Sequence, residues 1–85
     1  MTIHVFDTWV ENKKGETMHF DVFTLDKSSK KAIECAKEYL KSVGEEDAKV
    51  TAKECSFCHS QTAPDAAVKD LKKQGYFIYK MMNCP

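Results

Sequence analysis

The chain contains no arginine: all 13 of its basic residues are lysine, and 13 acidic residues balance them to a net charge of zero. Nucleic-acid surfaces need a net positive field, and the sequence-specific ones favour the planar arginine fork for phosphates and guanines. The lysines alternate with aspartate and glutamate along the chain, which is typical of a solvated surface. The composition therefore argues against nucleic-acid binding.

Long apolar runs are also missing. No segment approaches the roughly 18 apolar residues of a membrane helix, and the opening "MTIHVFDTWV" has neither the basic start nor the apolar stretch of a secretory signal. We therefore expect a cytoplasmic protein without membrane contact, in a compartment that keeps thiols reduced. The four cysteines are then expected to be free thiols or metal ligands rather than disulfides.

The length of 85 residues, 42% of them apolar, predicts one small folded domain spanning residues 1–85. The chain has no internal repeat, low-complexity tract or linker that would mark a second domain. At this size a single core is only marginally sufficient, so a metal that joins distant segments would add much to stability.

Two stretches rich in β-branched and aromatic residues, "TIHVFDTWV" (2–10) and "TMHFDVFTL" (17–25), predict strands. The short polar connection between them predicts an antiparallel hairpin. Alternation places Ile3, Val5 and Trp9 on one face of the first strand, with Phe6 on the other. Neither face of the hairpin is therefore plainly a solvent face.

Helical periodicity follows in two places. The stretch "LDKSSKKAIECAKEYLKSVG" carries an apolar stripe at spacings of three or four, with Asp26 or Ser28 as the N-cap. The stretch 62–74 predicts a second helix, with a capping box from Thr62 to Asp65. A glycine follows each predicted helix, where a left-handed residue ends it. Cys35 lies beside the first stripe and is expected to be a core residue.

Two further strands are predicted at 48–55 and 76–83, although the alternation of the former breaks at Cys55. The element order is β-β-α-β-α-β, an α+β fold with one mixed sheet of about four strands and two helices. If the last two strands share the sheet, they run parallel through a right-handed crossover. Their carboxyl ends would then bring Cys84 close to Cys55 and its neighbours.

The stretch "ECSFCHSQ" contains Cys-x-x-Cys-His and suggests a zinc site. Zinc binds four tetrahedral sulfur or nitrogen ligands, and three cysteines with one histidine form a known structural set. In an extended strand the two cysteines would lie roughly 10 Å apart, so ligation needs a turn between them. The sequence thus predicts a zinc-binding structural or partner-recognition module whose ligands are Cys55, Cys58, His59 and Cys84.

Adjacent side chains diverge, which makes the pair Cys58 and His59 awkward as joint ligands. His4 or His19 from the hairpin would be the substitute for His59.

Three other interpretations of the sequence are considered. Haem attachment also uses Cys-x-x-Cys-His, but it requires export and an enveloping apolar shell, so haem is not expected. A thiol–disulfide redox site would use Cys55 and Cys58, although the following helix begins too late for its dipole to activate them. A metal-free interaction module would bind a protein partner or a second copy through an exposed aromatic face, with structural thiols.

No catalytic constellation accompanies these motifs. A nucleophilic pair of Cys58 and His59 would need an orienting asparagine or aspartate, and none is evident nearby. The sequence therefore favours a binding protein over an enzyme.

The sequence as a whole resembles a small family of uncharacterised bacterial proteins, described only as a domain of unknown function. The resemblance runs through "IHVFDTWV", "MHFDVFT", "KKAIECAKEYL", "CSFCHSQTAPD" and "GYFIYKM", and so covers nearly the whole chain. It implies a compact α/β or α+β domain in bacterial cytoplasm. It carries over no functional residue, substrate or cofactor.

Overall fold

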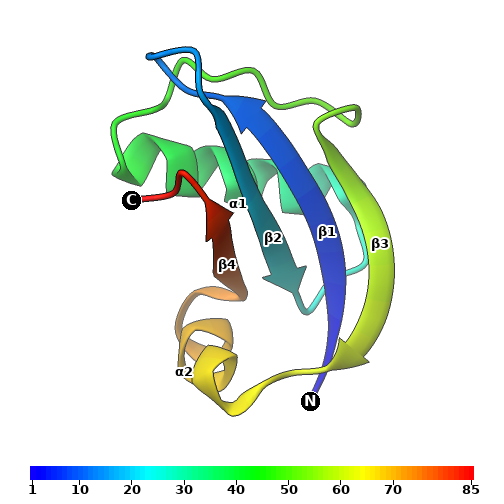
Figure 1. The fold of residues 1–85 in the computed structure, drawn as a ribbon. Coiled ribbons are helices and arrows are strands. Elements are labelled where there is room, and N and C mark those ends of the chain that lie inside the picture. The colour runs from blue at the N-terminus through cyan, green and yellow to red at the C-terminus, as the bar shows by residue number, and fades with distance from the viewer.

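The computed structural model describes all residues from 1 to 85 and contains four strands and two helices (Figure 1). The strands form a single sheet in the order β3-β1-β2-β4, and every neighbouring pair is antiparallel. The elements in chain order are β1 (Thr2–Glu11), β2 (Thr17–Thr24), α1 (Ser29–Ser42), β3 (Cys55–Thr62), α2 (Asp65–Gln74) and β4 (Tyr76–Met82).

The β1–β2 hairpin forms the centre of the sheet, and its alternating side chains serve both faces. Phe6 and Phe20 are fully buried on the face that α1 covers, where they join a core of 13 buried residues. Val5 lies opposite Phe23, and both point to the other face, into a smaller core of six buried residues. The predicted hairpin and its face assignment are therefore confirmed.

Helix α1 lies across one face of the sheet (Figure 1). Its N-cap is Ser28, whose hydroxyl accepts a hydrogen bond from the Lys31 amide at 3.3 Å, as the sequence predicts. Its buried stripe includes Cys35, which confirms the expectation that this thiol is a core residue.

Helix α2 lies beneath one end of the sheet and covers only part of the second face (Figure 1). Ala67 and Leu71 are its fully buried residues. Its end at Gly75, with a φ of 87°, agrees with the sequence. The predicted capping box is wrong, because the helix starts after Pro64 and no side chain caps it.

The third strand is not at 48–55 but at Cys55–Thr62, and it pairs with β1 as an edge strand. The segment before it is a loop, in which the side chain of Val50 is buried in the larger core. This buried apolar residue gives the sequence of the loop an alternation like that of a strand. The break predicted at Cys55 is not the end of a strand, because β3 begins there; the irregularity is a bulge three residues later. Phe57 and His59 face consecutive residues of β1, so Cys58 between them has no partner in the register.

The predicted α+β class, the element order and the single four-stranded sheet are confirmed. The parallel arrangement of the last two strands is wrong: β3 and β4 occupy opposite edges of the sheet and run in opposite directions. The hairpin lies between them because each of its strands still has a free edge with which a later strand can pair antiparallel.

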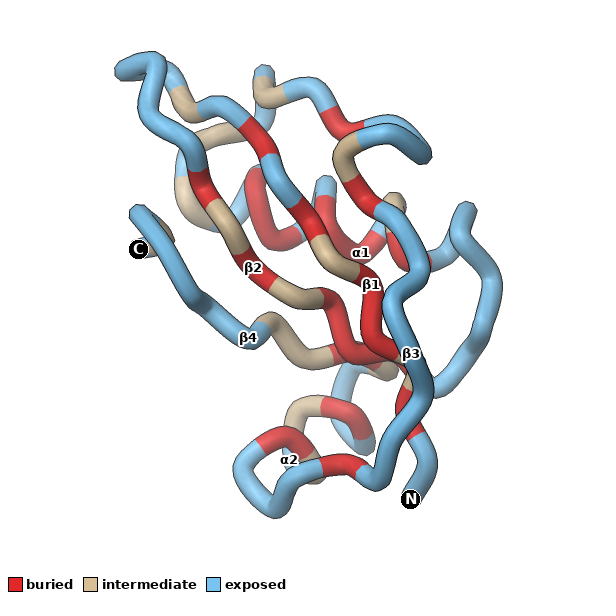
Figure 2. Tube along the Cα trace, turned by 45° about the vertical axis from the view of Figure 1, so that its right-hand side comes forward, coloured by how far each residue is buried: buried red, intermediate tan, exposed pale blue.

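Part of the second face carries no helix. In Figure 2 the middle and upper parts of β1 and β2 face the viewer, with α1 behind the sheet and α2 below it. This uncovered region, which we call the open face, holds the outward residues Asp7, Trp9, His19 and Asp21. Neither helix of the chain is long and apolar enough to cross a membrane.

Candidate functional site

Three ionisable side chains meet on the open face, all from the central hairpin. Asp7 on β1 lies directly opposite Asp21 on β2, and His19 is two residues from Asp21 on the same strand and face. A strand places residues i and i+2 on one face, so the register of the hairpin alone brings the three together. All three are partly buried.

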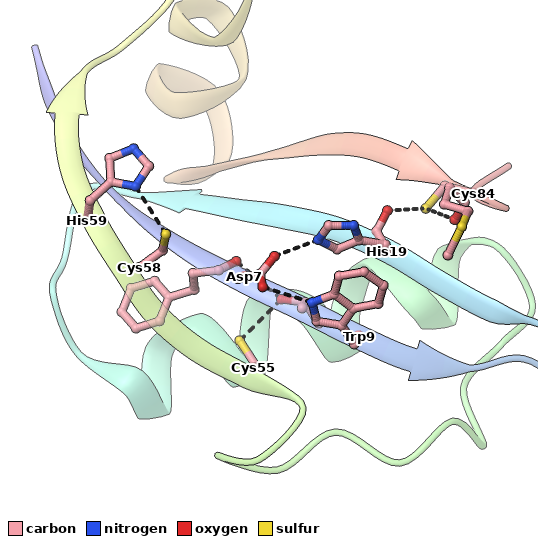
Figure 3. A network of polar contacts seen from close by, with 10 residues as sticks. Asp7, Trp9, His19, Cys55, Cys58, His59 and Cys84 are labelled. Carbon is pink, nitrogen blue, oxygen red and sulfur yellow. Dashed lines mark hydrogen bonds and ion pairs between the residues drawn. The ribbon is translucent and has the colours of Figure 1, made fainter.

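A fourth residue, Trp9, fixes the position of two members of this cluster (Figure 3). Its ring stacks on His19 with a centroid distance of 3.6 Å and an interplanar angle of 13°. Its indole N–H donates to Oδ2 of Asp7 at 2.8 Å. The second oxygen of Asp7, Oδ1, lies 2.5 Å from Nε2 of His19. Both oxygens of this carboxylate are therefore engaged, and the imidazole is held at a defined angle.

The two carboxylates are electrostatically unequal. Partial burial alone would raise the pKa of Asp7, but the hydrogen bonds from His19 and Trp9 outweigh it and lower that pKa below its ordinary value of 3.8. Burial, together with the charge of Asp7, raises the pKa of Asp21 to about 6. Like charges placed opposite each other across two strands are destabilising, so this pair favours a bound proton or cation.

The donor atoms suit a divalent metal ion. One ligand atom from each of Asp7, His19 and Asp21 lies within 4.8 Å of the other two. Imidazole nitrogen and carboxylate oxygen are both zinc ligands, and three protein ligands leave a fourth tetrahedral position for water or a partner group. This cluster is the one group of three or more metal-ligating side chains that lie close enough to share an ion.

No cavity covers the cluster. The largest cavity, of about 620 Å³, lies between α1, α2 and β4. Neither this cavity nor the three smaller ones are lined by Asp7, His19 or Asp21. Ligands of small-molecule enzymes are usually enclosed by a concave pocket. The open face is therefore suited to an ion or to the surface of a macromolecule.

The thiols that the sequence suggested as ligands are not brought together. Cys55 is 1% exposed and points into the larger core, where the Thr8 hydroxyl lies 3.4 Å from its sulfur. Burial raises the pKa of the Cys55 thiol. Cys58, three residues on, is exposed at the bulge. The expected turn that would join the two sulfurs at one ion is absent.

Cys84 follows β4 at the far edge of the sheet, where its thiol donates to the backbone oxygen of His19 at 3.3 Å. Two strands separate β3 from β4, which at about 4.8 Å per step sets the two edges roughly 14 Å apart. Two sulfurs on one zinc lie within about 4.6 Å, since each Zn–S bond is near 2.3 Å. The expected convergence of Cys84 with Cys55 and Cys58 is therefore wrong.

His59 lies beside one of these thiols only, that of Cys58. Its Nδ1 lies 3.2 Å from the sulfur of Cys58, and its Nε2 lies 2.6 Å from Oε1 of Gln61. His4, named as a substitute ligand, contacts Ser60 at 2.7 Å instead. Of the histidines considered from the sequence, only His19 lies in a group of metal-ligating side chains.

Sequence reasoning missed Asp7 and Asp21. A signal was present, because aspartate is depleted in strands and each predicted hairpin strand has one at its centre. Only the pairing register places the two opposite each other, and the register depends on the geometry of the connecting loop.

A family model described as a domain of unknown function (DUF2024) matches residues 1–81. Among solved structures, the NMR structure of protein NE1680 from Nitrosomonas europaea, a Northeast Structural Genomics Consortium target, is similar to the chain. The two are 58% identical, the match covers 100% of each, and the TM-score is 0.89. No curated protein matches the chain. The fold is thus shared with a bacterial protein, and no activity accompanies the match.

Proposed function

Since the chain belongs to the DUF2024 family, a domain of unknown function, we propose a function from its own side chains. The protein is a zinc-binding module in which Asp7, His19 and Asp21 hold the metal on the open face. This proposal keeps the metal that the sequence suggested and replaces the thiol ligands. The observation that carries it is the direct opposition of Asp7 and Asp21 beside His19, within 4.8 Å.

Each ligand has a physical reason to accept the metal. Asp7 and His19 already point at each other, so an ion between them replaces the proton that they share. Burial and the charge of Asp7 raise the pKa of Asp21, and a divalent cation beside both carboxylates would offset each effect. Trp9 keeps Asp7 and His19 oriented, as outer hydrogen bonds commonly do for metal ligands.

The role is binding rather than catalysis. The three side chains lie on the open face, with no cavity over them to hold a small substrate. Exposed aromatic side chains flank the site: Trp9 is 46% exposed, and Tyr79, opposite Asp21 on β4, is 50% exposed. A zinc ion flanked by exposed aromatic side chains on an uncovered sheet face suits recognition of a protein partner.

The test is zinc stoichiometry of the full chain, purified without chelator and dialysed against limiting zinc, with the metal counted by plasma mass spectrometry. We expect about one zinc per chain, which His19→Gln and Asp21→Asn both abolish. His4→Gln is the matched control, because His4 is on the same hairpin and the opposite face, and it should keep the metal.

A double variant, Cys58→Ser with Cys84→Ser, separates this proposal from thiol ligation. Retention of zinc by the double variant supports the carboxylate–imidazole site. If the double variant loses zinc while His19→Gln keeps it, the metal is bound by thiols and the proposal is wrong.

The aromatic residues also favour a second function, metal-free partner recognition through the same face. It requires that the wild-type chain bind no zinc and still form a complex, either with itself or with another protein. Sedimentation of the wild type against Trp9→Ala would detect self-association through this face.

A further inference from the structure

A second cluster of reactive side chains lies on the edge strand β3, apart from the open-face ligands. Cys58 is exposed at the bulge, and Nδ1 of His59 lies 3.2 Å from its sulfur. On the other side of the same ring, Nε2 of His59 lies 2.6 Å from Oε1 of Gln61. The three side chains form a line from thiol to imidazole to amide, of which Figure 3 shows the first contact.

This line sets the tautomer of the imidazole. The amide oxygen of Gln61 can only accept a hydrogen bond, so Nε2 of His59 carries the hydrogen that it receives. The neutral ring then has a lone pair on Nδ1, which faces the sulfur of Cys58. A thiol beside a base that a third group orients is the arrangement that activates a nucleophile.

We propose that Cys58, His59 and Gln61 form a thiol site that exchanges with low-molecular-weight disulfides. Nδ1 of His59 takes the thiol proton, and the sulfur of Cys58 attacks one sulfur of the disulfide. A new S–S bond forms to Cys58 while the old one breaks. The departing thiolate takes the proton from His59. Cys58 is thereby oxidised to a mixed disulfide, and the small disulfide is reduced to one thiol.

The adduct has no internal route of release. Cys55, the nearest cysteine in the sequence, is buried in the core on the sheet face that α1 covers. Cys84 lies beyond the opposite edge of the sheet. Since neither thiol reaches Cys58, the mixed disulfide persists until an external thiol removes it. This separates the site from the Cys55–Cys58 redox pair that the sequence suggested.

The test uses reduced, chelator-treated protein and oxidised glutathione as the probe, with adducts counted by intact mass and located by peptide mapping. We expect Cys58 to react first, well ahead of Cys84, whose half-buried thiol is hydrogen-bonded to the backbone oxygens of His19 and Met82. His59→Gln removes the base and should slow the Cys58 reaction about tenfold, below the usual range for a positioned base because the pair is exposed to water.

Gln61 is a positioning residue, and two substitutions separate its role from a structural one. Gln61→Leu removes the acceptor and should slow the reaction as His59→Gln does, whereas Gln61→Glu keeps an acceptor oxygen and should restore the rate. All three side chains are exposed, so thermal unfolding should be unchanged in these variants. An unchanged Cys58 rate in His59→Gln, or equal rates at Cys58 and Cys84, overturns the proposal.

Discussion

Trp9 and His19 face each other across the central hairpin, with their rings stacked at a centroid distance of 3.6 Å. Trp9 is the sole tryptophan of the chain, so its emission reports on the open face alone. A metal on His19 changes the electronic character of the ring that the indole contacts. The candidate site therefore contains its own optical probe.

We predict that zinc changes Trp9 fluorescence and that the change saturates at one equivalent. The stacked ring of His19 becomes an electron-poor metal ligand, which alters indole emission. His19→Gln should abolish the zinc response, and His4→Gln should retain it. A response that survives in His19→Gln would place the metal elsewhere.

Asp21→Asn should stabilise the metal-free protein at neutral pH. The folded-state pKa of Asp21, about 6, lies above its ordinary 3.8, so the folded state holds the extra proton between these values. Stability is then fully present below about pH 4 and falls as the pH rises through about 6. For a partly exposed group the loss is on the order of 1 kcal/mol.

The measurement is the free energy of unfolding in urea at pH 4 and pH 7.5. The variant should lose the decline that the wild type shows over this interval. Asp47→Asn in the exposed loop is the control and should leave the decline intact. If Asp21→Asn gains stability and loses zinc, the carboxylate of Asp21 destabilises the metal-free fold but is required for zinc binding. If Asp21→Asn is no more stable than the wild type at pH 7.5, the ionised carboxylate of Asp21 does not destabilise the fold and the prediction is wrong.

Cys55→Ala should destabilise the protein more than Cys58→Ala does, although both cysteines belong to the same motif. Cys55 is buried against Thr8, so its truncation leaves a small cavity and should cost about 1 kcal/mol. Cys58 is exposed, and its truncation should stay within about 0.5 kcal/mol of the wild type. Urea unfolding of both variants measures the two losses of stability. Equal losses would contradict the burial of Cys55 against Thr8.

Leu71→Ala should loosen α2 while the open face keeps its metal. Leu71 is 1% exposed in the smaller core, and such a truncation costs about 2–5 kcal/mol. Amide exchange should quicken in α2 first, because this helix depends on only six buried residues. Lys72→Ala, on the exposed side, is the control. Loss of the metal in folded Leu71→Ala would show that α2 supports the site.

The fold was largely predictable because its helices and hairpin carry local signals. The apolar stripe and Ser28 cap define α1, and alternation defines the faces of β1 and β2. The third strand was misplaced because Val50, buried from a loop, imitates a strand residue. The true strand β3 has only one buried residue, Cys55, and so shows no alternation.

The candidate site was less predictable because it depends on pairings distant in sequence. No local pattern determines that β3 joins β1 and β4 joins β2, which separates Cys84 from the Cys-x-x-Cys-His motif. His19 was named as a substitute ligand, but its partners Asp7 and Asp21 follow from the hairpin register. The contact between His59 and Gln61 depends on the strand β3, which the sequence did not predict.

The position of the hairpin at the centre of the sheet has a consequence for the order in which the protein assembles. All three proposed ligands lie within one hairpin, so the chain that must close around the ion is short. Closing a short loop costs less entropy than joining distant segments. An ion could therefore be captured before either edge strand has docked, and the hairpin would then enter folding as a closed, metal-bound unit onto which β3 and β4 add.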